Sequence, residues 1–207
     1  MSKKLNEITG YKVAGLTIDL MSKLRDGVID VEELERFVTL SPKERKKFFG
    51  EKEESILKLI STGENLKLDA CDGKKTIYDS KDVFAWKDDD FKNWKVNTTG
   101  PATAEISADI YEMAKDATFA EMFSSLGDLH KLCLTQSQIL NFIAKHKNWL
   151  RTEGYGTFFL FKANGNFFVA SVNVNSDGLS VHVIRLEDDI VWNAEGRHRI
   201  VIPQLDA

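Results

Sequence analysis

The feature that most constrains the fold is a pair of apolar segments, 157–163 and 166–174, which are joined by Asn164-Gly165. Asn-Gly is strongly preferred in two-residue hairpin turns, because both central residues of such a turn need a positive φ angle. The two segments are therefore expected to be neighbouring strands of an antiparallel hairpin.

The turn also sets the register of the two strands. Phe161 is expected opposite Phe168, and Phe159 opposite Ala170. The other face of the hairpin then carries four further apolar side chains, those of Phe158, Leu160, Phe167 and Val169. Because both faces are apolar, neither can stay in contact with water. We expect the helix after Thr135 to cover one face, and a second layer, which closes a sandwich or a partial barrel, to cover the other.

The rest of this C-terminal region is expected to extend the hairpin. Thr135 and Gln138 form a capping box, which predicts that a helix begins there. A mostly apolar stripe at helical spacing follows, formed by Ile139, Phe142, Ile143, His146 and Leu150. After the hairpin, turn residues lead into further expected strands at 179–187, 190–192 and 198–202. Together the strands are expected to form an antiparallel meander.

The N-terminal part has the pattern of short helices. Apolar spacing and capping patterns predict helices near 16–24, 31–39, 42–49 and 53–60. Gly63 is expected to end this region, which divides the chain into a helical N-terminal region, 1–62, and an α+β main domain, 63–207. The middle of the chain is expected to contribute strands near 66–70, 76–78 and 83–86, then helices near 104–114 and 119–126. The predicted fold class is α+β, with short N-terminal helices and then helices packed on an antiparallel β-meander.

Composition favours a cytoplasmic protein without a membrane partner. The 207 residues carry a net charge of −4, and 43% of them are hydrophobic, which is enough for a substantial core. No segment approaches the roughly 20 apolar residues of a membrane helix, and the N-terminus lacks the pattern of a signal peptide. The two cysteines, Cys71 and Cys133, are far apart in the sequence, which is typical of a reducing compartment.

Four segments of the last third carry a resemblance to known sequences. They are Leu132-Cys133-Leu134-Thr135, Asn148-Trp149-Leu150-Arg151, Thr157-Phe158-Phe159-Leu160-Phe161 and Arg197-His198-Arg199. In these segments the region from Lys131 to Leu205 resembles a family of uncharacterised bacterial proteins, with a weaker similarity in the helices around Asp30 to Lys47. The resemblance implies a shared fold and no particular activity.

Cys133 is the one candidate nucleophile, with His130 or His146 as its base. It precedes the expected helix start after Thr135, where the helix dipole would lower the pKa of a thiol. The competing interpretation, which we favour, is a small buried side chain between two leucines. His146 lies on the apolar stripe of its helix, so a buried histidine with satisfied hydrogen bonds is the simpler interpretation.

Two groups of basic residues are candidate contacts for an anion or a nucleic acid. The first lies on the expected helix 42–49 and consists of Lys43, Arg45, Lys46 and Lys47. The second consists of Arg197 and Arg199, which share one face of a strand, and Arg185, which is expected to join them across the meander. Packing of the first helix through its two phenylalanines, and local ion pairs around the arginines, are the alternatives that we favour.

Motifs for cofactors and metals are absent from the sequence. Gly73-Lys74-Lys75-Thr76 resembles the end of a phosphate-binding loop, but Leu68 stands where the first glycine is needed. The turn from Asn173 to Gly178 begins like a calcium loop, but Ile184 stands where the bidentate Glu is needed. The four histidines are scattered, so no metal and no cofactor is predicted.

These observations favour a non-enzymatic binding or interaction protein, with another protein as its expected partner. The alternative is a nucleic-acid-binding protein that uses the basic helix 42–49 or the arginine strand 197–199. An enzyme that depends on Cys133 is the third hypothesis.

Overall fold

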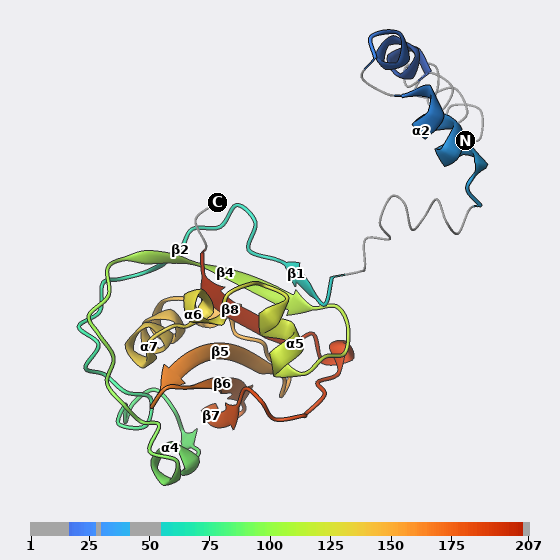
Figure 1. The fold of residues 1–207 in the computed structure, drawn as a ribbon. Coiled ribbons are helices and arrows are strands. Elements are labelled where there is room, and N and C mark those ends of the chain that lie inside the picture. The colour runs from blue at the N-terminus through green and yellow to red at the C-terminus, as the bar shows by residue number, and fades with distance from the viewer. Residues whose placement is uncertain (1–16, 28–29, 42–54, 205–207) are drawn as a thin grey trace, which may run out of the picture. The chain divides into compact units, whose positions relative to one another are not determined.

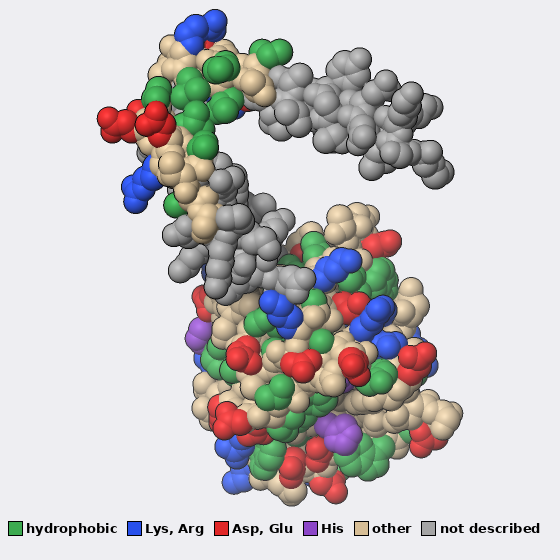
Figure 2. All heavy atoms as spheres, turned by 90° about the vertical axis from the view of Figure 1, so that its right-hand side faces the viewer, with side chains coloured by type: hydrophobic (Ala, Val, Ile, Leu, Met, Phe, Trp, Pro, Cys, Tyr) green, Lys and Arg blue, Asp and Glu red, His purple; other side chains and the backbone are tan. Residues whose placement is uncertain are grey.

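The computed structural model describes residues 17–27, 30–41 and 55–204 (Figure 1), whose side chains are coloured by type in Figure 2. The chain divides into two compact units, Met1–Glu53 and Glu54–Ala207. In the first unit, residues 17–25 are helical and α2 spans Val31–Thr39, where Asp30 accepts a hydrogen bond from the backbone of Glu32. The predicted helix 42–49, with Lys43, Arg45, Lys46 and Lys47, lies outside the described residues.

The second unit is built on one eight-stranded mixed sheet, mostly antiparallel, so the α+β class is confirmed. Its strands are β1 Leu57–Leu59, β2 Leu66–Leu68, β3 Trp86–Lys87, β4 Ile106–Met113, β5 Gly156–Ala163, β6 Asn166–Asn175, β7 Gly178–Arg185 and β8 Arg199–Pro203. The order is β1-β4-β8-β5-β6-β7-β3, with β2 also paired to β4. The order ends in β1 and β3 and does not close on itself.

The helices of this unit are short. They are α4 Asp90–Asn93, α5 Phe119–Ser124, α6 Leu129–Leu132 and α7 Gln136–Lys145, with 3-10 turns at Lys147–Trp149 and Ala194–Gly196. Both α5 and α7 begin with a complete capping box, the second of which is the predicted pair of Thr135 and Gln138. The predicted helix near 119–126 is therefore confirmed as α5.

The β5–β6 hairpin has the predicted register. Phe161 lies opposite Phe168, and Phe159 opposite Ala170. The turn residues Asn164 and Gly165 both have positive φ angles, of 50° and 85°. This agreement follows because the turn type alone sets which residues face each other.

Each face of the hairpin lies in a separate hydrophobic cluster. The first, here called the α7-side core, includes Ile139, Phe142, Ile143, Phe159, Phe161, Phe168 and Val201. The second, the α5-side core, includes Phe119, Met122, Phe123, Leu132, Phe158, Leu160 and Ile200. In Figure 1, α7 lies beside β5, in agreement with the contact between the rings of Phe142 and Phe159.

Two segments expected to be helical are strands. The predicted helix near 104–114 is wrong, because this segment is β4, which pairs with β1, β2 and β8. Its apolar residues fit helical spacing but also alternate between the two cores, with Ile110 in one and Met113 in the other. The predicted helix near 53–60 is also wrong, since 57–59 form β1 of the main sheet.

Three predicted strands also differ. Residues 77–79 form a turn, and of 83–86 only Trp86 enters a strand, the edge strand β3, which runs parallel to β7. In 190–192, Trp192 makes a single bridge to Ala117. The meander ends at β7, because β8 lies between β4 and β5 and runs parallel to β5.

Candidate functional site

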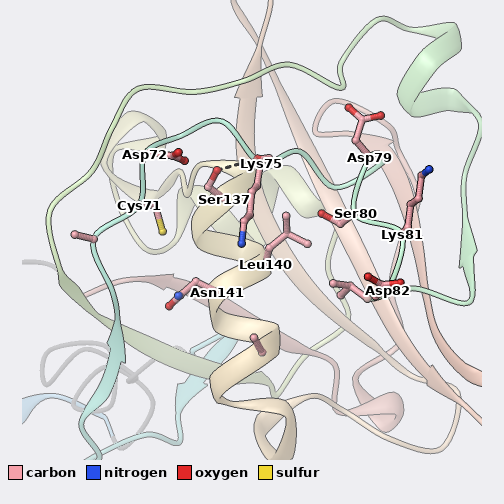
Figure 3. A pocket seen from close by; sticks show the side chains of 13 residues that line it. Cys71, Asp72, Lys75, Asp79, Ser80, Lys81, Asp82, Ser137, Leu140 and Asn141 are labelled. Carbon is pink, nitrogen blue, oxygen red and sulfur yellow. Dashed lines mark hydrogen bonds between the residues drawn. The ribbon is translucent and has the colours of Figure 1, made fainter.

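A cavity of about 740 Å³ lies between the segment 70–83 and α7 (Figure 3). The segment, here called the wall segment, supplies most of the lining, and α7 supplies Ser137, Leu140, Asn141 and Ala144. This volume falls in the range of pockets that hold small ligands. Of the predicted site residues that the structure describes, none lines it.

The first turn of α7 holds the wall segment through two buried polar side chains. The side-chain oxygen of Gln136 accepts a hydrogen bond from the backbone N–H of Ile77 at 2.9 Å, and its amide nitrogen donates to the carbonyl of Val96 at 2.8 Å. The hydroxyl of Ser137 donates to the carbonyl of Lys75 at 2.8 Å. Buried irregular backbone needs such partners, so these two residues determine where the wall lies.

Gly73 sets the path of the wall segment at its start. Its φ angle is +75°, and a Cβ atom there would lie 2.2 Å from the carbonyl oxygen of Gly100. The carbonyl of Gly73 accepts a hydrogen bond from the backbone N–H of Gly100 at 2.9 Å. A side chain at this position would therefore push the wall segment away from residues 100–101.

Several polar groups of the lining are already bonded to the protein. Asp79 accepts hydrogen bonds from Thr76 at 2.7 Å and Asn97 at 2.9 Å, which hold the pKa of its carboxyl below the usual value. Ser80 donates to the carbonyl of Thr76, and Asn141 bonds the backbone and side chain of Asp69. These groups shape the cavity and are occupied by the fold.

Three charged side chains of the lining have no such partner. Lys75, Lys81 and Asp82 are exposed, and within the described residues none of the three forms an ion pair. In Figure 3 the side chain of Lys75 extends from the wall segment towards α7, whereas Lys81 directs its ammonium group away from it. Leu140, which is 6% exposed, and Val83 supply apolar surface beside them.

Cys71, which lines the cavity, is a protonated thiol at neutral pH. Burial raises the pKa of its thiol above the ordinary value. Its sulfur donates a hydrogen bond to the carbonyl of Asp69 at 3.3 Å. The thiol is therefore a weak nucleophile.

The environment of Cys133 opposes the predicted lowering of its pKa. Burial raises the pKa of this thiol to about 11, and its sulfur donates to the carbonyl of Leu129 at 3.3 Å. His130 packs against the ring of Phe167, and Nε2 of His146 lies 2.9 Å from the carbonyl oxygen of Lys67. In the described part of the chain, neither histidine hydrogen-bonds to this thiol.

Arg199 and Arg151 bind backbone carbonyls. Nη1 of Arg199 donates to the carbonyl of Trp149 at 2.9 Å, and Nε of Arg151 donates to that of Gly196 at 3.1 Å. These bonds connect the chain around 149–151 with β8 and the turn before it. Arg199 is thus engaged in holding two segments together, and Arg197 is an exposed residue with a left-handed backbone.

The structure does not bring Arg185 to the other two arginines. Arg185 pairs with Phe168 of β6, whereas Arg199 pairs with Thr157 of β5, which faces Val172 of β6. Phe168 and Val172 are four residues apart, which is about 13 Å along a strand, and β8 and β7 are separated by two strands. Arg185 instead lies over the ring of Trp94, at 4.9 Å.

Comparison with known proteins gives no relative from which to transfer a function. The chain matches no protein-family model, no curated protein and no solved structure. In residues 17–27, 30–41 and 55–204, no group of three His, Cys, Asp or Glu side chains is arranged to hold a metal ion. The same residues include no helix that is long and apolar enough to cross a membrane.

Proposed function

We propose that this protein is a non-enzymatic binding protein, and that its main unit takes a small ligand in the cavity between the wall segment and α7. The observation that carries the proposal is a cavity of about 740 Å³ lined by Lys75 and Asp82, whose charges the described part of the protein leaves unpaired. A concave site with apolar surface and a few available polar groups is the usual form of a ligand pocket.

The two competing hypotheses have less support. An enzyme that uses Cys133 needs a thiolate, but burial raises the pKa of this thiol to about 11. Nucleic-acid binding through the arginine strand needs free guanidinium groups, but Arg199 is bonded to the carbonyl of Trp149. Binding through the basic helix 42–49, and a protein partner, stay predictions from the sequence.

The proposal is tested by titrating a fragment library into the full-length, 15N-labelled chain and following the backbone amide resonances by NMR. We expect fragments that bind to shift the resonances of residues 70–83 and of the first turn of α7, because these segments form the two sides of the cavity.

A pair of variants makes the test specific. Ala144 lines the cavity and is exposed, so Ala144→Trp is expected to fill the site and abolish the shifts. Ala104→Trp adds the same side chain at an exposed position outside the cavity and is expected to leave them unchanged. If no fragment shifts the resonances of residues 70–83, or if Ala144→Trp binds the fragments as well as the unmodified chain does, the cavity is not a binding site.

A further inference from the structure

We infer that the cavity binds a short ligand that carries both a carboxylate and a protonated amine, such as a short peptide with free ends. In this arrangement Lys75 contacts the carboxylate, Asp82 contacts the amine, and the apolar lining contacts the part between them. The inference rests on the proposed function and adds the chemical class of the ligand.

The first step is to separate occupied charges from available ones. Asp79 is held by Thr76 and Asn97, and one carboxylate oxygen of Asp72 accepts the backbone N–H of Lys74 at 3.0 Å. Lys81 points away from α7 in Figure 3. Apart from Lys81, this leaves Lys75 and Asp82 as the charged groups of the lining that form neither a hydrogen bond nor an ion pair within the described residues, so we assign the ligand contacts to these two.

The second step concerns the separation of these two charges. Lys75 and Asp82 line the same cavity, yet they form no ion pair with each other, so the ammonium and carboxylate groups are more than 4.0 Å apart. The cavity therefore presents a positive and a negative group that are not in contact with each other. This arrangement is complementary to a ligand that carries one charge of each sign at separate positions. A simple anion would satisfy Lys75 and leave Asp82 repelling it.

The third step concerns the surface available to the middle of the ligand. Leu140, Val83, Ala70 and Ala144 contribute apolar atoms to the lining. An extended tripeptide is about 10 Å long, and its central side chain would lie against this surface. A medium-sized apolar residue between two small ones therefore suits the site.

The experiment uses alanyl-leucyl-alanine in four forms: free, N-acetylated, C-amidated and blocked at both ends. Each is titrated into the full-length, 15N-labelled chain, and affinity is read from the resonances of residues 70–83. The free form is expected to bind best. Each blocked end is expected to weaken binding about threefold to fivefold, because it removes one solvent-exposed ion pair.

Three variants assign the two ends of the ligand. Lys75→Met is expected to abolish the effect of C-amidation and to keep that of N-acetylation, whereas Asp82→Asn is expected to do the reverse. Lys131→Met, at an exposed lysine outside the cavity lining, is the matched control and is expected to change neither effect. All three residues are exposed, so the substitutions leave the core intact.

The outcomes separate this inference from the proposed function. If the doubly blocked peptide binds as tightly as the free one, or if inorganic phosphate competes in a Lys75-dependent way while Asp82→Asn has no effect, the ligand is not a zwitterion, although the cavity is still a binding site. If neither the peptides nor the library fragments shift the resonances of residues 70–83, the proposed function is wrong as well.

Discussion

The two faces of the sheet are closed in different ways. On the α5 side, the ring of Phe158 lies 4.8 Å from that of Phe119, 4.7 Å from that of Trp192 and 5.0 Å from that of His198, measured between centroids. On the α7 side, irregular chain also reaches the core, and hydrogen bonds from Gln136 hold it there.

This difference explains where the cavity lies. Interlocking aromatic rings fill the space between elements at close-packed density. On the α7 side the N–H and C=O groups of the wall segment need polar partners, and these partners bring the polar side chains of Gln136 and Ser137 beside the core. The α7 side therefore combines an apolar floor with polar walls, and the α5 side is mainly a structural core.

The largest effects are expected from Phe158→Ala and Phe142→Ala, which remove fully buried rings on opposite faces. Each is expected to lower the free energy of unfolding by about 3–5 kcal/mol, because a cavity is left in the core. Urea unfolding measures both losses.

The comparison predicts a difference in binding between these two variants. Phe142 belongs to the buried face of α7, which forms one side of the cavity, so its removal is expected to weaken ligand binding there, whereas removal of Phe158 is expected to leave the affinity of the folded fraction unchanged. Equal effects on binding would show that the two faces are not independent.

The next effect is expected from Gln136→Ala. It leaves the N–H of Ile77 and the carbonyl of Val96 without their side-chain partner, at a cost of roughly 2–4 kcal/mol in the free energy of unfolding. Ser137→Ala removes one hydrogen bond and is expected to cost about 1 kcal/mol. The measurement is hydrogen exchange at the Ile77 amide, which is expected to be fast in Gln136→Ala and slow in Ser137→Ala. This difference distinguishes a loosened wall segment from a general loss of stability.

A smaller effect is expected from Arg199→Met. The substitution keeps an unbranched side chain but removes the bond to the carbonyl of Trp149, which is expected to cost about 1.5 kcal/mol. Arg197→Met is the control at the exposed neighbouring arginine and is expected to stay within about 0.5 kcal/mol of the unmodified chain. If Arg199→Met instead left stability unchanged and abolished binding to nucleic acid, our structural assignment would be wrong.

The last prediction concerns pH. Burial lowers the pKa of His198 below its ordinary value, and the nearby positive charge of Arg151 lowers it further. The unfolded chain therefore takes up a proton on this residue near pH 6.5, while the folded chain does so only at lower pH. Unfolding binds a proton in this interval, so stability falls as the pH drops through 6.5 and levels off below the folded pKa.

The measurement is the melting temperature of the unmodified chain and of His198→Gln between pH 7.5 and pH 5.5. The other three histidines are present in both proteins, so only the difference in slope is compared. A shallower slope is expected for the variant. Parallel slopes would contradict a histidine that is kept neutral by burial on the α5 side.

Features that depend on neighbours along the chain follow directly from the amino-acid sequence. The Asn164-Gly165 turn has the register that its dipeptide predicts, and the capping box at Thr135 begins α7. In both cases the atoms that decide the conformation lie within a few residues of each other, so a short stretch of sequence contains the whole interaction.

Features that depend on partners far apart in the sequence follow only from the folded arrangement. The apolar residues of β4 suit a helix or a strand, and the segment is a strand because β1, β2 and β8 supply hydrogen bonds on its two edges. One side of the cavity is likewise held in place by Gln136, which hydrogen-bonds to Ile77 and Val96. These two residues lie 59 and 40 positions before it in the chain. A buried amide side chain hydrogen-bonds to whichever groups lie next to it in space. The sequence around Gln136, Lys75 or Asp82 contains no local pattern that predicts these neighbours.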